Sequence, residues 1–237
     1  MTGSSGWYWR GVRAAFSIPG LILAFAFVGF AGLAKEAGLT LPQTLFMTGI
    51  VWALPAKVVL VGAILSGSAL PAATLAVTLS SMRLMPMVVS IVPEMRGEAT
   101  RKWVLYLLAH FVAVTSWVIA LERFAHVPRD MRTSFYAGLG PTLVLINLGV
   151  VTLVFLLAAR LPPGVSAALF LLTPIYFLTS LWASARERAA HAAMGLGIVL
   201  GPLFHLLTPA YDLLAAGLIG GAAAYGFHLL SLRKIVR

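Results

Sequence analysis

The sequence predicts an all-α, polytopic membrane protein. Of its 237 residues, 60% are hydrophobic and only 10% are charged, and the mean hydropathy is +0.96. A soluble domain would be about 45–50% apolar and about 25% charged. The apolar runs are continuous over about 20 residues, the length a helix needs to cross a bilayer, whereas barrel strands alternate over about ten. We therefore expect one transmembrane transporter domain over residues 1–237.

About eight transmembrane helices follow from the hydropathy. The first, at 14–34, comes after a short polar segment with two arginines. Its apolar run exceeds the 7–15 residues or so of a signal-peptide core, so we expect a retained helix. The other spans are expected near 43–66, 69–92, 103–121, 138–159, 165–184, 189–207 and 211–230.

The distribution of Lys and Arg over the connections predicts that both ends are cytoplasmic. With that orientation ten of these residues lie inside and five lie outside, leaving out the two within spans. Cytoplasmic loops carry the excess of positive charge. The connection 93–102 is discordant, since it places Arg96, Arg101 and Lys102 outside. A re-entrant second or third span would move it to the cytoplasm.

Two cations stand inside the second and third spans, each close to a proline. Pro55 precedes Lys57, Pro86 follows Arg83, and no acid occurs between Glu36 and Glu94. Proline removes a backbone donor and breaks or kinks a helix, so both spans should be interrupted there. An ionisable residue at membrane depth indicates a functional site by default.

Two interpretations of these cations are open. Lys57 and Arg83 either bind carbonyls freed by the prolines, or meet a substrate carboxylate. In the second case Arg83 is the main candidate for the carboxylate and Lys57 a second cation. Trp52 and the flexible Met82 and Met85 would then line an apolar pocket.

Three further polar side chains lie within later helices and are candidates for a polar relay. They are His110, Asn147 and His205. Interhelical hydrogen bonds explain such residues equally well. Asp212, at the start of the last helix, is explained by capping and by the helix dipole.

Other function classes lack their signatures. The formal net charge of +10 is explained by cytoplasmic loops facing lipid headgroups, so nucleic acid is not expected as a partner. There is no cysteine, no phosphate-binding glycine motif and no histidine pattern for a metal. We expect no cofactor, no metal and no enzymatic activity.

Several short patterns, in order along the chain, resemble those of the AzlC-like branched-chain amino acid exporter large subunit. They are Gly11 to Gly32, Thr48-Gly49-Ile50-Val51-Trp52 leading to Gly62-Ala63, Ser81-Met82-Arg83, Ala109-His110-Phe111, Leu161-Pro162-Pro163, Ala168-Leu169-Phe170 and Pro174-Ile175-Tyr176-Phe177. The departures fall at polar positions: Trp52 replaces a glutamine and Ser81 an asparagine. The resemblance adds Ser81 to the candidate substrate-binding residues.

The resemblance implies a transporter that exports branched-chain or other small apolar amino acids across the inner membrane. It also implies a small AzlD-like membrane partner. Two alternatives stay open. One is a non-transporting membrane subunit whose Lys57 and Arg83 pair with acids of a partner protein. The other is an intramembrane enzyme, which would need catalytic groups around His110 or His205.

Overall fold

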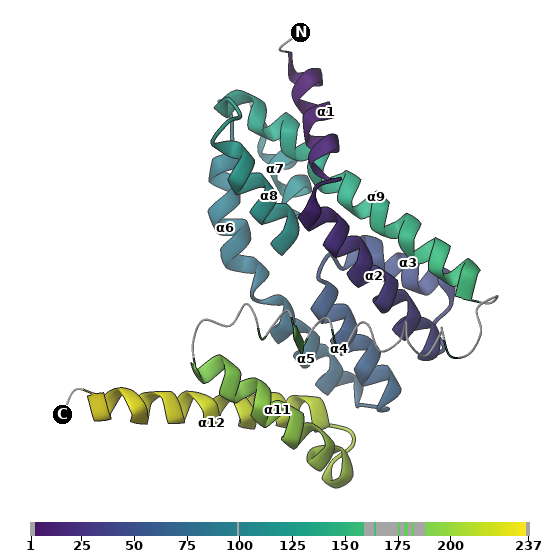
Figure 1. Cartoon of the computed structure of the whole chain (residues 1–237), viewed down its shortest axis with the longest axis vertical. Helices are drawn as coiled ribbons and strands as arrows, with labels where there is room; N and C mark the ends of the chain where they lie inside the picture. Colours follow the sequence, from purple (N-terminus) through teal and green to yellow (C-terminus); the bar gives the residue numbers. More distant parts are fainter. Residues whose placement is uncertain are drawn as a thin grey trace. The chain divides into compact units, whose positions relative to one another are not determined.

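The structure is a computed structural model that describes residues 3–98, 100–158, 164, 175, 178, 179, 182 and 188–235. These residues contain helices and no strands, which confirms the predicted all-α class. They fall into two compact units (Figure 1). The expected span 165–184 lies almost wholly outside the described residues.

The first unit contains most of the N-terminal two thirds of the chain. Its helices are α1 (Ser4–Ala14), α2 (Ile18–Glu36), α3 (Leu41–Ile50), α6 (Leu84–Met95), α7 (Lys102–Ala109), α8 (Val114–Phe124), the 3-10 turn η1 (Arg129–Met131) and α9 (Arg132–Ala158). The second unit contains α4 (Leu54–Leu65), α5 (Leu70–Ser81), α11 (Arg188–Leu207) and α12 (Asp212–Ile235).

Five helical stretches among the described residues are long and apolar enough to cross a membrane. They are Ile18–Glu36, Leu70–Met95, Arg129–Leu157, Ala189–Leu207 and Asp212–Leu229. Each overlaps an expected span. The count of eight is not confirmed, because the expected spans 43–66 and 103–121 consist of shorter helices.

The second and third expected spans are interrupted as predicted. Residues 51–53 separate α3 from α4, directly before Pro55. Met82 and Arg83 separate α5 from α6, and Pro86 lies in the first turn of α6. A proline there cannot donate the backbone hydrogen bond that would continue α5, so the helix is interrupted at Met82 and Arg83.

The fourth expected span, a single helix over 103–121, is wrong. Residues 110–113 interrupt it and the chain turns back, so α7 and α8 form a hairpin. Arg132 on α9 donates to the Phe124 carbonyl at the end of α8 at 3.0 Å. Thr133 bonds Thr100, just before α7, at 2.9 Å between hydroxyl oxygens. Both ends of the hairpin therefore lie at the same end of the unit.

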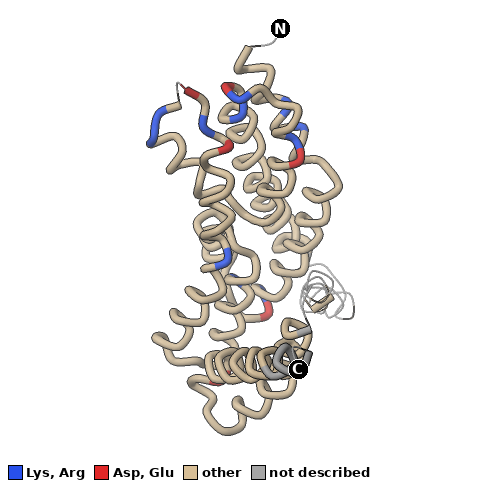
Figure 2. Tube along the Cα trace, turned by 90° about the vertical axis from the view of Figure 1, so that its left-hand side faces the viewer, with Lys and Arg blue, Asp and Glu red and all other residues tan. Residues whose placement is uncertain are grey.

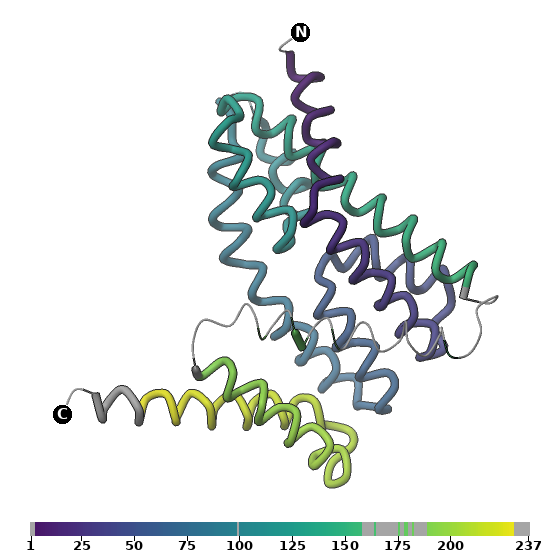
Figure 3. The backbone as a smooth tube through the Cα atoms, in the orientation of Figure 1, coloured from purple at the N-terminus to yellow at the C-terminus, as the bar shows by residue number. Residues whose placement is uncertain are grey.

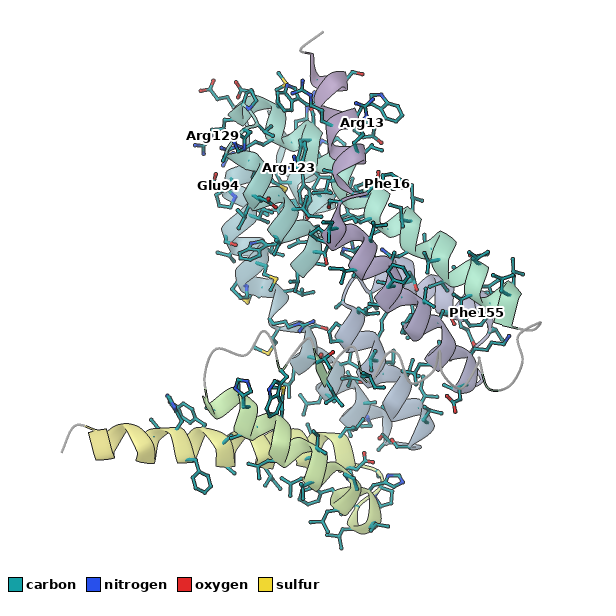
Figure 4. All side chains as sticks on the ribbon, in the orientation of Figure 1. Arg13, Phe16, Glu94, Arg123, Arg129 and Phe155 are labelled. Carbon is teal, nitrogen blue, oxygen red and sulfur yellow. The ribbon has the colours of Figure 1, made fainter. Side chains whose placement is uncertain are left out.

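One end of the first unit carries most of its charged residues (Figure 2). Arg132 pairs with Glu94 at the end of α6, and Thr133 donates to the Met95 carbonyl at 2.6 Å. Figure 4 labels Arg13, Glu94, Arg123 and Arg129 at this end. We call it the charged end. The connections 93–102 and 125–128 therefore lie at the same end of the unit, whereas a single helix over 103–121 would place them at opposite ends.

The long helix α9 runs beside α1 near the charged end and beside α2 over the rest of its length (Figure 3). Where α2 begins, a Cβ on Gly20 would lie 3.4 Å from the Leu143 side chain of α9. At the other end, Lys35 donates to the Phe155 carbonyl at 3.4 Å. The two parallel helices form the frame on which the shorter helices pack.

Candidate functional site

Two helix interruptions of the first unit touch each other. His110 follows the last residue of α7, and its Nε2 lies 3.0 Å from the carbonyl oxygen of Gly49 in the last turn of α3. The last carbonyls of a helix have no partner within the helix. This hydrogen bond therefore joins the polar end of α3 to the turn of the α7–α8 hairpin.

The meeting point lies far from both ends of the unit. At 1.5 Å per residue, α7 reaches about 12 Å from the charged end and α8 about 16 Å. The helix α3 begins at the opposite end and extends about 15 Å before it stops. Because the hydrocarbon core is about 30 Å thick, the two interruptions meet near mid-depth.

Side chains of α8 and α9 hold the 110–113 turn in place. The Tyr136 hydroxyl donates to the Phe111 carbonyl at 3.1 Å, and the Ser116 hydroxyl accepts the Ala113 N–H at 2.9 Å. A Cβ on Gly140 would lie only 2.6 Å from the Phe111 Cβ, so glycine allows the turn to approach α9. Sequence reasoning missed Ser116, Tyr136 and Gly140. A serine three residues after Ala113 was the available signal, since it suits the start of a helix.

Trp52 lies in the interruption after α3 and forms an aromatic wall with α2. Its side chain is 6% exposed, and its ring stacks on Phe27 with centroids 5.8 Å apart and planes at 28°. Phe30 meets Phe27 edge to face. The prediction that Trp52 borders an apolar space is consistent with this position.

Arg83 caps the N-terminus of α6 and is half-buried. Its Nε is buried and has no hydrogen-bond partner among the described residues. From the charged end, α6 extends about 18 Å, so Arg83 lies at nearly the depth of the 110–113 turn. Ser81 ends α5, whereas Met82 and Met85 are 58% and 68% exposed, which leaves these methionines outside any enclosed pocket.

The remaining candidate residues lie in different units of the structure. Lys57 lies on α4 of the second unit and is completely buried. His205, also in the second unit, bonds Asp212 across the α11–α12 connection at 2.8 Å between Nδ1 and Oδ2. Asn147 lies on α9 of the first unit, where its Nδ2 donates to the Leu143 carbonyl at 2.6 Å and its buried Oδ1 has no partner among the described residues.

The meeting point offers complementary groups for a zwitterion. Carbonyl oxygens at the end of α3 can accept from an ammonium group. The first N–H groups of α8 have no partner within the helix, and the positive end of the helix dipole favours a carboxylate there. Proline-interrupted and unwound helices near mid-membrane are where transporters bind substrates.

Comparison with known proteins agrees with this geometry. The family model described as AzlC protein matches residues 20–161, a range that includes most of α2, the three helix interruptions and α9. No curated protein and no solved structure matches the chain. Because the family match spans more than half of the sequence, the chain belongs to the AzlC family, which is associated with branched-chain amino acid transport.

Proposed function

We propose that this multi-pass membrane protein exports branched-chain and other small apolar amino acids across the inner membrane. The substrate binds where the interruption after α3 meets the turn between α7 and α8. The observation that carries the proposal is the His110–Gly49 hydrogen bond, which joins two half-length helices from opposite ends of the unit. Non-helical backbone at such depth is tolerated only within protein or along a polar cavity.

Arg83 supplies the positive charge for the substrate carboxylate. A guanidinium binds a carboxylate through two parallel hydrogen bonds, and Nε is one of its donors. The buried Nε of Arg83 has no hydrogen-bond partner among the described residues. This favours a counter-ion that binds and dissociates, as a transported substrate does. Trp52 on Phe27 supplies the apolar contact for the substrate side chain.

We further propose that the five long apolar stretches of the described residues cross the membrane and that two shorter segments are re-entrant. The hairpin α7–α8 enters from the charged end and returns there. The helix α2 ends at the opposite end, and the stretch Leu70–Met95 ends at the charged end, as one crossing would. With that crossing, both ends of the intervening α3–α4 segment belong to one side of the membrane. We propose that it is the second re-entrant segment.

A small AzlD-like membrane protein is the proposed partner, and this rests on the resemblance alone. The second candidate function, a non-transporting subunit, would use Arg83 and Lys57 to pair with acids of that partner. The two functions predict different effects of neutralising Arg83. As a counter-ion for substrate it affects transport, whereas as a counter-ion for a partner it affects assembly.

The test measures leucine movement in proteoliposomes that contain the protein with and without a small AzlD-like membrane protein. We expect counterflow of leucine that valine, isoleucine and methionine inhibit and lysine does not. Arg83→Gln should abolish counterflow and ligand-induced thermal stabilisation, while Arg83→Lys retains part of both. The melting temperature without ligand should stay near that of the wild type.

Arg96→Gln is the matched control, because Arg96 follows the other end of the same helix α6 and is exposed. It should transport normally. Unchanged leucine affinity in Arg83→Gln would contradict the carboxylate role. Loss of partner binding, with ligand binding intact, would favour the subunit function.

A further inference from the structure

A basic hollow at the charged end of the first unit is not explained by amino acid transport. It has a volume of about 320 Å³ and lies between α1, the end of α8 and the start of α9. Its lining residues are Trp7, Arg10, Arg13, Ala14, Arg123, His126, Val127 and Phe135. Figure 4 labels two of these arginines, Arg13 and Arg123, at the same end of the unit.

The lining has three arginines and no acid. The nearby acids are directed elsewhere: Glu94 pairs with Arg132, and Asp130 accepts the Glu98 N–H at 3.5 Å. Glu122 precedes Arg123 in α8 and does not line the hollow. Like charges converging on one space repel one another, and an anion placed between them removes that repulsion.

Two of the three arginines, Arg10 and Arg13, lie on the helix α1, which is fixed in position. A Cβ on Gly11 of α1 would lie 2.0 Å from the Phe135 carbonyl, and a Cβ on Gly138 would lie 2.1 Å from the Tyr8 carbonyl. The two backbones therefore cross in direct contact, as small residues permit. Arg10 also lies over the Trp7 ring, 4.2 Å from its centroid. The hollow is thus formed before any ligand arrives.

The position of the hollow indicates a ligand at the membrane surface. The helix α1 carries Trp7, Tyr8 and Trp9 in one turn, and aromatic residues of this kind gather at headgroup level. Just beyond α1, Phe16 and Ile18 are 60% and 74% exposed and begin the apolar surface. A ligand in the hollow therefore has headgroup surroundings on one side and hydrocarbon on the other.

We propose that this hollow binds the phosphate group of an anionic phospholipid. Arginine forks match phosphate oxygens in bidentate geometry, and basic pockets between transmembrane helices bind lipid headgroups. Free phosphate shares this chemistry, but it would gain nothing from the aromatic and apolar border. The hollow lies apart from the meeting point of the helix interruptions, so the lipid-binding proposal can be tested independently of the transport proposal.

The experiment uses the whole chain purified in a neutral detergent. Native mass spectrometry and thermal shift titrations measure binding of phosphatidylglycerol, phosphatidylcholine and inorganic phosphate. The test variant carries Arg10→Gln, Arg13→Gln and Arg123→Gln. The matched control removes three exposed cations of the same end outside the hollow, through Arg96→Gln, Arg101→Gln and Lys102→Gln.

The wild type should bind phosphatidylglycerol in preference to phosphatidylcholine. The test variant should lose this binding by about 100-fold, about fivefold for each arginine, and the control should lose much less. Equal losses of binding in the two triple variants would overturn the proposal, since lipid binding would then depend on the total positive charge of this end and not on the hollow. Stabilisation by inorganic phosphate but not by phosphatidylglycerol would overturn the assignment to lipid. If the triple variant does not fold, Arg10→Gln and Arg123→Gln singly should each weaken binding about fivefold, and unchanged binding in both would refute the site.

Discussion

Gly140→Ala tests whether the 110–113 turn must lie directly against α9. The added Cβ would lie 2.6 Å from the Phe111 Cβ, whereas ordinary contacts begin at 3.4 Å, so the turn must retreat by roughly 0.8 Å. Two hydrogen bonds oppose this movement, because Tyr136 donates to the Phe111 carbonyl and Ser116 accepts from Ala113. Overpacking of this kind costs about 1–3 kcal/mol. It should also pull His110 away from Gly49 and reduce transport.

Gly149→Ala is the control, because Gly149 lies on the same helix with nothing within 4 Å of an added Cβ. Both variants gain about 0.5–1 kcal/mol from replacing a helical glycine, so their difference isolates the clash. Unfolding in SDS–detergent mixtures gives the free energies, and leucine counterflow gives the activity. We expect Gly140→Ala to be less stable than Gly149→Ala by about 1–3 kcal/mol and slower in transport. Equal stability and equal transport would refute close packing at this site.

Three further predictions concern the links between elements. His110→Ala should lower leucine counterflow strongly, and it should lower the free energy of unfolding by only about 0.5–1.5 kcal/mol, since one hydrogen bond between the two interruptions is lost. A loss of stability without a loss of transport would make His110 purely structural. Asp212→Asn should destabilise the protein by about 1–3 kcal/mol, because the bonds from His205 and Ser68 to a buried carboxylate weaken; an unchanged melting temperature would contradict this. Because the chain has no cysteine, the single variants Glu98→Cys and Glu36→Cys can each be labelled with a membrane-impermeant maleimide. The two positions should react from opposite sides of the membrane. Labelling of both from the same side would refute the proposed crossings.

Local chemistry made two of the three interruptions predictable. Pro55 and Pro86 indicate them in the sequence, because proline disrupts the helix that contains it regardless of the tertiary contacts around it. The interruption at 110–113 contains neither proline nor glycine. It depends on Tyr136 and Gly140 of α9, more than 20 positions further along the chain, and no local pattern reveals such a contact.

The candidate site was predictable in its residue types and less so in its membership. An uncompensated cation beside a proline indicates Arg83, which lies directly before α6 at the helix interruption. The backbone carbonyl of Gly49 and the N-terminus of α8 have no signature in the sequence, since every residue has a carbonyl and every residue except proline has an N–H. His110 was considered for a relay, whereas its contact is to the backbone of α3. The helix α1 was missed because its arginines and aromatic residues look like a polar leading segment.

The charges of the connections give an independent argument for the re-entrant hairpin. A single helix over 103–121 puts Arg96, Arg101 and Lys102 on the side opposite Arg123, Arg129 and Arg132, and the count is then ten against five. Together with the proposed re-entrant α3–α4 segment, a hairpin brings all six to the side of both chain ends, and the count becomes thirteen against two. Positive charge on short loops sets orientation, so the arrangement with the stronger asymmetry is the one a membrane would enforce. The hydrogen bonds of Thr133 and Arg132 to both ends of the hairpin lead to the same arrangement without any reference to charge counting. A half-length helix then has to end inside the membrane, and its backbone groups need partners there. The His110–Gly49 bond supplies one such partner, and the remaining groups leave room for a substrate with an ammonium and a carboxylate.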